Sequence, residues 1–350
     1  MPFLQRDLSA GATSLFTTYT PVINGSGFTE IPVTLGKTLY VSSSQGNDSN
    51  DGLTEQTPVQ TITRSKQLHV GGDHILLRCG DTWLDEDFDS VAGSGDIVNP
   101  TVIAFYGDIS LGRPRMENGD NPFMSYTASN PTRPSGMYLM GIHMLKYKFK
   151  VGDPRFDNSN INASYTAISI LGSCAGFLLE DCVIDHGEVI FQAFQGGSPS
   201  GIQVRRNIWT GAYYFNSSFD RDKVAVNVYF EGMLDGPIVE ENTVDHGGWS
   251  RDVAGCGANQ YNHNFYVQAD ENGDQSNDGI YRKNIITRAS SHGIHMRPGG
   301  WSDNNFFGKN TVQVQGGYSS RPLDPADHFW LDNCVLSETT SMFKLMQNLL

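Results

Sequence analysis

Residues able to move protons and to bind anions gather between positions 245 and 297. Four of the nine histidines lie in this stretch, together with Tyr266 and Arg297. Imidazole titrates near neutral pH, so it can take up or release a proton under physiological conditions. Guanidinium binds a carboxylate through two parallel hydrogen bonds. This composition indicates proton-transfer chemistry on a substrate that carries a carboxylate.

A β-eliminating polysaccharide lyase needs three groups of this kind. A cation neutralises the carboxylate of a uronate unit, a base removes the adjacent proton, and an acid protonates the leaving glycosidic oxygen. We assign the first role to Arg297, the second to His263 and the third to Tyr266. His246 and His292 are alternatives for the acid. The sequence therefore predicts a carbon–oxygen lyase that cleaves an acidic, uronate-containing glycan.

Aromatic and polar side chains nearby are the candidates for substrate binding, namely Trp249, His295, Tyr214, Asn262 and Trp301. His295 alternates with Ile294 and Met296, so it faces the opposite side of a strand. It lies there either hydrogen-bonded inward or toward the substrate. Structural roles compete with the catalytic ones, because His263 can anchor a loop and Arg297 can pair with a carboxylate.

Two other functions stay open. A glycoside hydrolase needs a general acid and a second carboxylate, roughly 6.5–9.5 Å apart when it inverts configuration. The candidate carboxylates are Asp245, Asp270, Asp278 and Glu241. A non-catalytic phage tail-spike or adhesin would instead bind glycan through aromatic side chains. The aromatic candidates are Trp249, Trp301, Tyr213 and Tyr214.

Metal ligands are not predicted at the catalytic residues. The five cysteines are widely spaced without a CxxC pair, so we expect buried, reduced thiols and no zinc site. The segments Asn47-x-Ser49-x-Asp51 and Asp274-x-Ser276-x-Asp278 have calcium-loop spacing but lack Glu at the twelfth position of an EF-hand. Calcium binding through their carboxylates stays open, and no other cofactor is expected.

Short strands with a repeat position these residues. Six segments alternate apolar residues, then carry two mostly polar residues, an Asn or Asp mark, and an apolar residue two positions later. The marks are Asp181, Asn207, Asn242, Asn284, Asn310 and Asn333. Short strands recurring every ~25 residues without helices indicate a parallel β-helix, whereas a β-sandwich or propeller would show more two-residue hairpin turns. We expect the marked residues to stack along the axis.

Two long spacings between marks place excursions near residues 210–235 and 247–277. Extra residues cannot enter a stacked coil, so we expect them to project as loops, where function commonly resides. Asp185-His186 and Asp245-His246 follow their marks at similar offsets. With the coils in register, His186, His246 and His292 would lie on one side of the solenoid.

The segment 38–83 carries Gly71-Gly-Asp-His-Ile-Leu-Leu-Arg78 after a turn rich in Gly, Asn and Asp at 46–52. It resembles the opening of right-handed parallel β-helix proteins of the pectate-lyase-like superfamily, in which strands, a turn and a short helix cap the solenoid. The resemblance implies an all-β fold, a right-handed parallel β-helix at 36–350 with its cap at 36–90. Residues 1–35, rich in Ser, Thr and Gly, are expected to form an N-terminal arm.

The stretch His292-Gly-Ile-His-Met-Arg297-Pro-Gly-Gly300, followed by Asn304-Asn-Phe-Phe, resembles one coil of the β-helix chondroitinase/alginate lyase family. There an Arg after a short strand precedes a Gly turn and an NNxF strand. The resemblance places Arg297 at the family's catalytic Arg. That family takes a Lys base from the preceding coil, and this chain offers there Asn262, His263, Tyr266 and Gln268.

Composition bounds the partners and the location. With 24 basic and 38 acidic residues the net charge is −14, which argues against a nucleic-acid binder with a broad basic face. There is no apolar run of ~18 residues to span a membrane, and the first residues do not resemble a signal peptide. We expect an extracellular or virion-associated protein that binds a polysaccharide as a monomer or homotrimer. A trimer would carry a long exposed apolar stripe along the axis.

Overall fold

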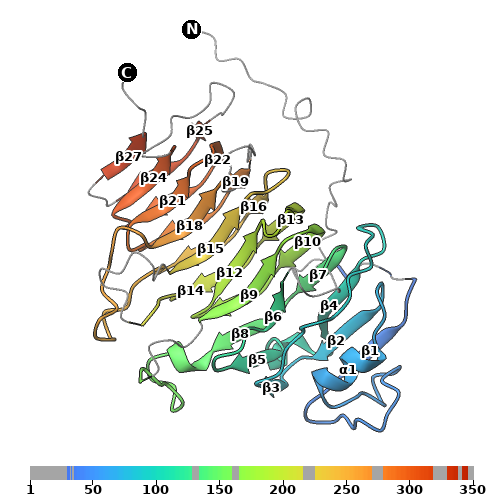
Figure 1. Cartoon of the computed structure of the whole chain (residues 1–350). Coiled ribbons are helices and arrows are strands. Elements are labelled where there is room, and N and C mark those ends of the chain that lie inside the picture. Colours follow the sequence, from blue (N-terminus) through green and yellow to red (C-terminus); the bar gives the residue numbers. More distant parts are fainter. Residues whose placement is uncertain are drawn as a thin grey trace.

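Short parallel strands wind into three sheets, I, II and III, that run along one axis (Figure 1). The computed structural model describes residues 30–31, 33, 35–127, 134–159, 165–215, 225–269, 279–317, 329–337 and 341–345. Nearly all of the expected arm at 1–35 and the whole segment 270–278 lie outside the described residues. From residue 101 onward each coil passes through sheets I, II and III in turn, as a right-handed parallel β-helix does, so the predicted fold is confirmed.

The strands of each sheet stack along the axis in the order in which they occur in the chain. Sheet I contains β1 (Thr38–Val41), β2 (His74–Arg78), β4 (Thr101–Tyr106), β7 (Met137–Met140), β10 (Cys174–Glu180), β13 (Pro199–Arg205), β16 (Ile238–Glu240), β19 (Ile280–Arg282), β22 (Gly300–Asp303) and β25 (Phe329–Asp332). Sheet II contains β3 (Thr82–Leu84), β5 (Arg115–Asn118), β8 (His143–Lys146), β11 (Val183–Asp185), β14 (Ile208–Thr210), β17 (Thr243–Asp245), β20 (Ile285–Thr287), β23 (Phe306–Gly308) and β26 (Val335–Ser337). Sheet III contains β6 (Met124–Tyr126), β9 (Thr166–Leu171), β12 (Glu188–Gln192), β15 (Val226–Glu231), β18 (His263–Gln268), β21 (His292–Met296), β24 (Val312–Gly316) and β27 (Ser341–Leu345).

The core fills the space between the sheets with one inward row from each strand position. In sheet I, Leu179, Val204, Val239 and Tyr281 occupy successive positions of one row and are at most 1% exposed. Burying such a side chain contributes about 1.5–3 kcal/mol. Each coil therefore depends on the coils at either side to cover its apolar residues.

Three short helices accompany the sheets in the described residues, and none has the length and apolar character needed to span a bilayer. They are α1 (Ile62–Leu68), η1 (Ile109–Leu111) and η2 (Tyr147–Phe149). Helix α1 begins after Thr61, whose side chain accepts a hydrogen bond from the Arg64 amide. It lies beside β1 at the first coil, within the segment expected to form the cap (Figure 1), and Ile62 enters the core.

A buried asparagine ladder fixes the turn from sheet I to sheet II. Asn207, Asn242, Asn284 and Asn305 are each 1% exposed. Each of the first three donates from Nδ2 to Oδ1 of the next, at 3.1, 2.9 and 3.0 Å. Their main-chain amides donate to the same oxygens. The predicted stacking is thus confirmed for three of the six marks.

The other three marks are wrong as ladder positions. Asp181 and Asn333 precede the ladder by one residue and adopt the left-handed backbone, with φ of 52° and 47°. Asn310 lies at the turn from sheet II to sheet III, where its Oδ1 accepts from the Ala289 amide at 2.8 Å. In that coil Asn305 occupies the ladder position instead of Asn310. Asparagine side chains accept main-chain bonds at both corners of the coil, so the sequence pattern does not tell the two corners apart.

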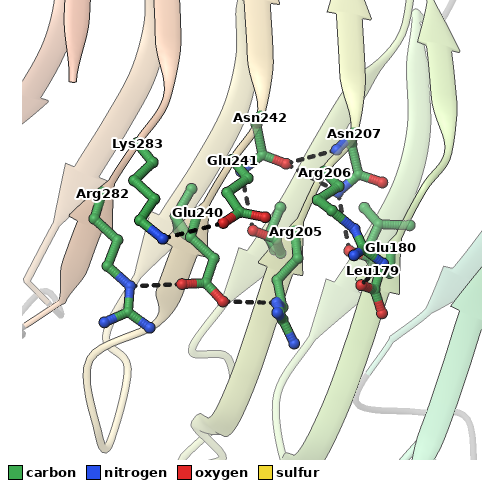
Figure 2. A network of polar contacts seen from close by, with 12 residues as sticks. Leu179, Glu180, Arg205, Arg206, Asn207, Glu240, Glu241, Asn242, Arg282 and Lys283 are labelled. Atoms are coloured by element: carbon green, nitrogen blue, oxygen red, sulfur yellow. Dashed lines mark hydrogen bonds and ion pairs between the residues drawn. The ribbon is translucent and has the colours of Figure 1, made fainter. Parts of the chain in front are cut away.

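Charged residues at the ends of the sheet I strands pair along the axis (Figure 2). Glu240 forms an ion pair with Arg205, with Nε and Oε1 2.7 Å apart, and accepts a hydrogen bond from Arg282 Nε at 2.5 Å. Arg206 bonds to Glu180 in the same network. The side chain of Glu240 is only 8% exposed, so its negative charge is balanced by Arg205 and Arg282 and little by solvent.

Sheet II carries an exposed apolar row on its outer face. Ile208, Ile285, Phe306 and Val335 share one register position, with Thr243 between the first two. Their exposed fractions run from 39% to 56%. The row has the direction of the stripe that a trimer would use, and the oligomeric state stays a prediction.

Candidate functional site

Five of the predicted site residues meet on sheet III, on the adjacent strands β18 and β21 and just after them. They are His263, Tyr266, His292, His295 and Arg297. In the strand register His263 pairs with His292, and Tyr266 pairs with His295. The structure therefore brings together residues that are up to 34 positions apart in the chain, as the predicted stacking of coils requires.

Strand alternation decides which of these side chains face outward. Ile294 and Met296 are fully buried in the core, so His295 between them faces the outer side of sheet III. Tyr266 lies between the buried Phe265 and Val267 and faces the same side. The orientation predicted for His295 relative to its neighbours is confirmed.

Tyr266 and Arg297 form the more accessible half of this cluster, since both are partly exposed. The guanidinium carbon of Arg297 lies 5.0 Å from the centre of the Tyr266 ring. The Tyr266 hydroxyl donates to Gln268 Oε1 at 2.8 Å, and Arg297 Nη1 donates to the same oxygen at 3.3 Å. The cation and the phenol thus share one hydrogen-bond acceptor.

The three histidines form the buried half. Their ring centres lie 4.8 Å apart for His263 and His292, 4.8 Å for His292 and His295, and 5.3 Å for His263 and His295. His263 is 3% exposed and its ring centre lies 4.9 Å from that of Tyr266. Burial, with the nearby His292, His295 and Arg297, holds the pKa of His263 well below its usual value. His263 is therefore neutral.

Tyr229 and Glu231 of β15 extend the same face, and the sequence analysis missed both. Tyr229 stacks on Tyr266 with ring centres 5.3 Å apart and donates to Glu231 Oε2 at 2.7 Å. Gln192 donates to the same carboxylate oxygen at 2.6 Å. Burial, with the Glu231 carboxylate adding to it, raises the pKa of Tyr229. The signal was present, because Tyr229-x-Glu231 aligns with Tyr266-x-Gln268 in the strand register.

His246 and Trp249 lie elsewhere, at the turn from sheet II to sheet III. Their rings stack with centres 4.3 Å apart, and Trp249 Nε1 donates to the Arg288 carbonyl at 2.8 Å. Burial opposes ionisation of Asp245, but hydrogen bonds from Arg288 and Thr287 outweigh it and lower the pKa of this carboxyl. Asp245 is therefore held as an ionised partner of Arg288 and is poorly suited to be a general acid.

The expected alignment of His186, His246 and His292 is wrong in its third member. His186 and His246 occupy the same turn position, with Gly211 between them, as their amide bonds to the following coil show. In the next coil this position is held by Arg288, whose amide bonds to the Gly308 carbonyl. His292 comes four residues later, on β21, because residues 289–291 complete the turn first.

The remaining candidates have structural contacts away from this cluster. Asn262 is fully buried, where its Oδ1 accepts from the Ala225 amide and its Nδ2 donates to the Gly248 carbonyl. Tyr214 packs on a loop cluster that includes Tyr165. Trp301 lies on sheet I against Trp330.

The described residues include some of the candidate hydrolase carboxylates and one of the two calcium-loop segments. Glu241 pairs with Lys283 at 3.3 Å, while Asp270 and Asp278 lie outside the described residues, as does Asp274. In the first calcium segment, Asn47 Oδ1 accepts from Ser49 and Asp51 Oδ1 accepts from the Leu53 amide. These oxygens close local turns.

No protein-family model matches the chain. A segment of 82 residues is 34% identical to a lacto-N-biosidase of Bifidobacterium longum subsp. longum and covers 23% of this chain and 5% of that protein. The chain thus spans about one twentieth of the curated relative that it matches. Among solved structures, a GH136 lacto-N-biosidase from Eubacterium ramulus is similar with a TM-score of 0.49 and 12% identity over 89% of this chain and 68% of that one. A rhamnogalacturonan lyase has a TM-score of 0.49 and 14% identity over 90% and 86% of the two chains. An alginate lyase from Paenibacillus sp. str. FPU-7 has a TM-score of 0.43 and 12% identity over 89% and 98%.

Proposed function

We propose that the chain cleaves a uronate-containing glycan by β-elimination on the outer face of sheet III, at β18 and β21. The observation that carries the proposal is the pair formed by Arg297 and Tyr266, with the guanidinium carbon 5.0 Å from the phenol ring centre. Both side chains are partly exposed. A sugar unit that reaches one therefore reaches the other.

The chemistry divides between these two residues. Arg297 binds the uronate carboxylate and lowers the cost of removing the proton from the adjacent carbon. Tyr266 first releases its hydroxyl proton to solvent. Its phenolate then takes the substrate proton, and the resulting phenol returns that proton to the leaving glycosidic oxygen, so each cycle ends with the phenolate restored. The carbon–oxygen bond breaks as the new carbon–carbon double bond forms.

This assignment moves the base from His263, where the sequence analysis placed it, to Tyr266. His263 is 3% exposed and His295 is 6% exposed, so both meet the substrate less readily than Tyr266 does. Their rings lie 4.9 and 5.5 Å from the ring of Tyr266. We propose that they hold that ring in position.

Hydrolysis is the second candidate, and the local match to a lacto-N-biosidase favours it. On the same face Glu231 supplies a carboxylate, oriented by Tyr229 and Gln192. A hydrolase would depend on Glu231, whereas the proposed lyase depends on Tyr266. In a hydrolase the loss of Glu231 should therefore lower activity more than the loss of Tyr266. In the proposed lyase the loss of Tyr266 should lower it more.

The test incubates the full chain with a panel of uronate-containing polysaccharides and with oligosaccharides that carry lacto-N-biose. Elimination gives new ends together with the absorbance of an unsaturated uronate. We expect Arg297→Gln and Tyr266→Phe each to lower turnover ~100-fold or more, with Tyr40→Phe on sheet I as the matched control. New ends without absorbance, abolished by Glu231→Gln, would replace the lyase by the hydrolase. Binding without new ends would make the protein an adhesin.

A further inference from the structure

The three buried imidazoles on sheet III have a second use that needs no substrate. We propose that His263, His292 and His295 form a binding site for a divalent transition-metal ion, for which Zn²⁺ is the best-suited candidate. Each of the three offers one ring nitrogen to a group whose atoms all lie within 4.8 Å of one another. The inference departs from the sequence analysis, which expected no metal ligands among these residues.

The distances are close to those of a metal-bound set. The Nδ1 atoms of His263 and His292 lie 3.1 Å apart. With zinc–nitrogen bonds of about 2.0–2.1 Å, two tetrahedral ligands stand about 3.3 Å apart. The widest separation in the group would therefore close by about 1.5 Å when the ion enters, which small rotations of the imidazole rings supply.

The ring of His292 is already oriented for binding. Its Nε2 lies 2.5 Å from Gln315 Oε1, and that oxygen only accepts, so Nε2 carries the proton. A neutral imidazole protonated at Nε2 carries its lone pair at Nδ1, which faces His263 Nδ1 at 3.1 Å and Ser291 Oγ at 2.9 Å. An entering ion would take the place of these two hydrogen bonds. At His295, Gln315 Nε2 donates to ring Nε2 at 3.0 Å, so an ion would bind through Nδ1 or displace this bond. The bond from His292 Nε2 to Gln315 is an outer contact of the kind that orients the histidines of known metal centres.

The donor set selects the class of ion. Imidazole nitrogen suits Zn²⁺, Cu²⁺, Ni²⁺ and Fe²⁺, whereas Ca²⁺ requires six to eight oxygen ligands. Three protein ligands leave a fourth position for water or a substrate oxygen. The ring of Tyr266 borders the cluster, 4.9 Å from His263 and 5.5 Å from His295. The site is therefore of the open, three-histidine kind.

The test measures metal binding by the full chain without any glycan, so its outcome is separate from that of the proposed function. The protein is stripped with a chelator and titrated with Zn²⁺ in a calorimeter. We expect one ion per chain with submicromolar affinity. His292→Gln and His295→Gln should each weaken binding by about 100-fold or more, because each removes one of three ligands. The matched control is His143→Gln on sheet II, which should bind as the wild type does.

Cobalt substitution of the wild-type chain makes the test independent of whether a variant folds. Co²⁺ bound by imidazoles gives the visible bands of a tetrahedral nitrogen site without the near-ultraviolet band of a thiolate ligand. A thiolate band would move the ion to a cysteine and overturn the proposal. So would an absence of binding at ~100 µM metal, or an unchanged affinity in folded His292→Gln and His295→Gln proteins.

Discussion

A buried carboxyl group at the start of β12 makes the stability of the fold depend on pH. Glu188 is 6% exposed. Burial raises its pKa to about 8, although hydrogen bonds from the Tyr165 hydroxyl and the Val226 amide work in the opposite direction. Glu188 is therefore largely protonated in the folded chain at neutral pH, whereas an unfolded glutamate with a pKa of 4.5 is ionised.

The size of the effect follows from proton linkage. Between pH 4.5 and about 8 the folded chain binds one proton more than the unfolded chain does at this residue. The free energy of unfolding then falls as pH rises, by about 1.4 kcal/mol per unit. The stabilisation is complete below pH 4.5 and is lost as pH rises through about 8. From pH 5.5 to 7.5 the loss is about 2.7 kcal/mol.

The Glu188→Gln substitution removes the titrating group and keeps an acceptor oxygen for the Tyr165 hydroxyl. Urea unfolding of both proteins at pH 5.5, 6.5 and 7.5 should show that the variant gains stability relative to the wild type at each step. Glu55→Gln, at an exposed glutamate, is the matched control and should leave the slope unchanged. Parallel pH profiles for the wild type and Glu188→Gln would refute the reasoning.

Three further substitutions test the solenoid itself. Burial lowers the pKa of Lys146 to about 7. The free energy of unfolding should therefore rise with pH between about 7 and 10.5, by about 1.4 kcal/mol per unit. Lys146→Met should abolish that rise in denaturant titrations. Asn242→Leu leaves the Val204 carbonyl and the Asn207 amide unpaired and should cost about 3 kcal/mol, seen as a lower urea midpoint; a loss under 1 kcal/mol would contradict the ladder's role. Glu240→Gln should cost about 2 kcal/mol in the same assay, less than a fully buried pair because its partner Arg282 is 40% exposed, and high salt should shrink the difference.

The fold was predictable because each coil repeats the same local pattern of apolar and polar side chains. An asparagine that follows two polar residues after a strand bonds to the backbone of neighbouring coils, and three of the predicted positions do so. Which corner a given asparagine serves was not predictable. Asn305 and Asn310 lie five residues apart and accept the same kind of main-chain bond at different turns.

The composition of the site was predictable and its register was not. The stretch 245–297 was recognised from its histidines, and five of its residues meet on sheet III. Residue spacing groups His292 with His246, because it does not show that Arg288 takes the turn position. A shift of four residues along the coil carries a side chain from a corner to a strand, and side-chain spacing alone does not fix where the turn ends.

The contrast between two faces explains why the site is assigned to sheet III. At the ends of the sheet I strands Glu240 binds two guanidinium groups, so charges of opposite sign meet along the axis and stabilise the stack. On sheet III Arg297 lies against the ring of Tyr266 and donates to the side-chain oxygen of Gln268, at a partly exposed position. A partly exposed guanidinium can bind an anion through two parallel hydrogen bonds, whereas Arg205 and Arg282 already share the Glu240 carboxylate. The same residue type therefore stabilises the coils on one face and can attract a uronate on the other.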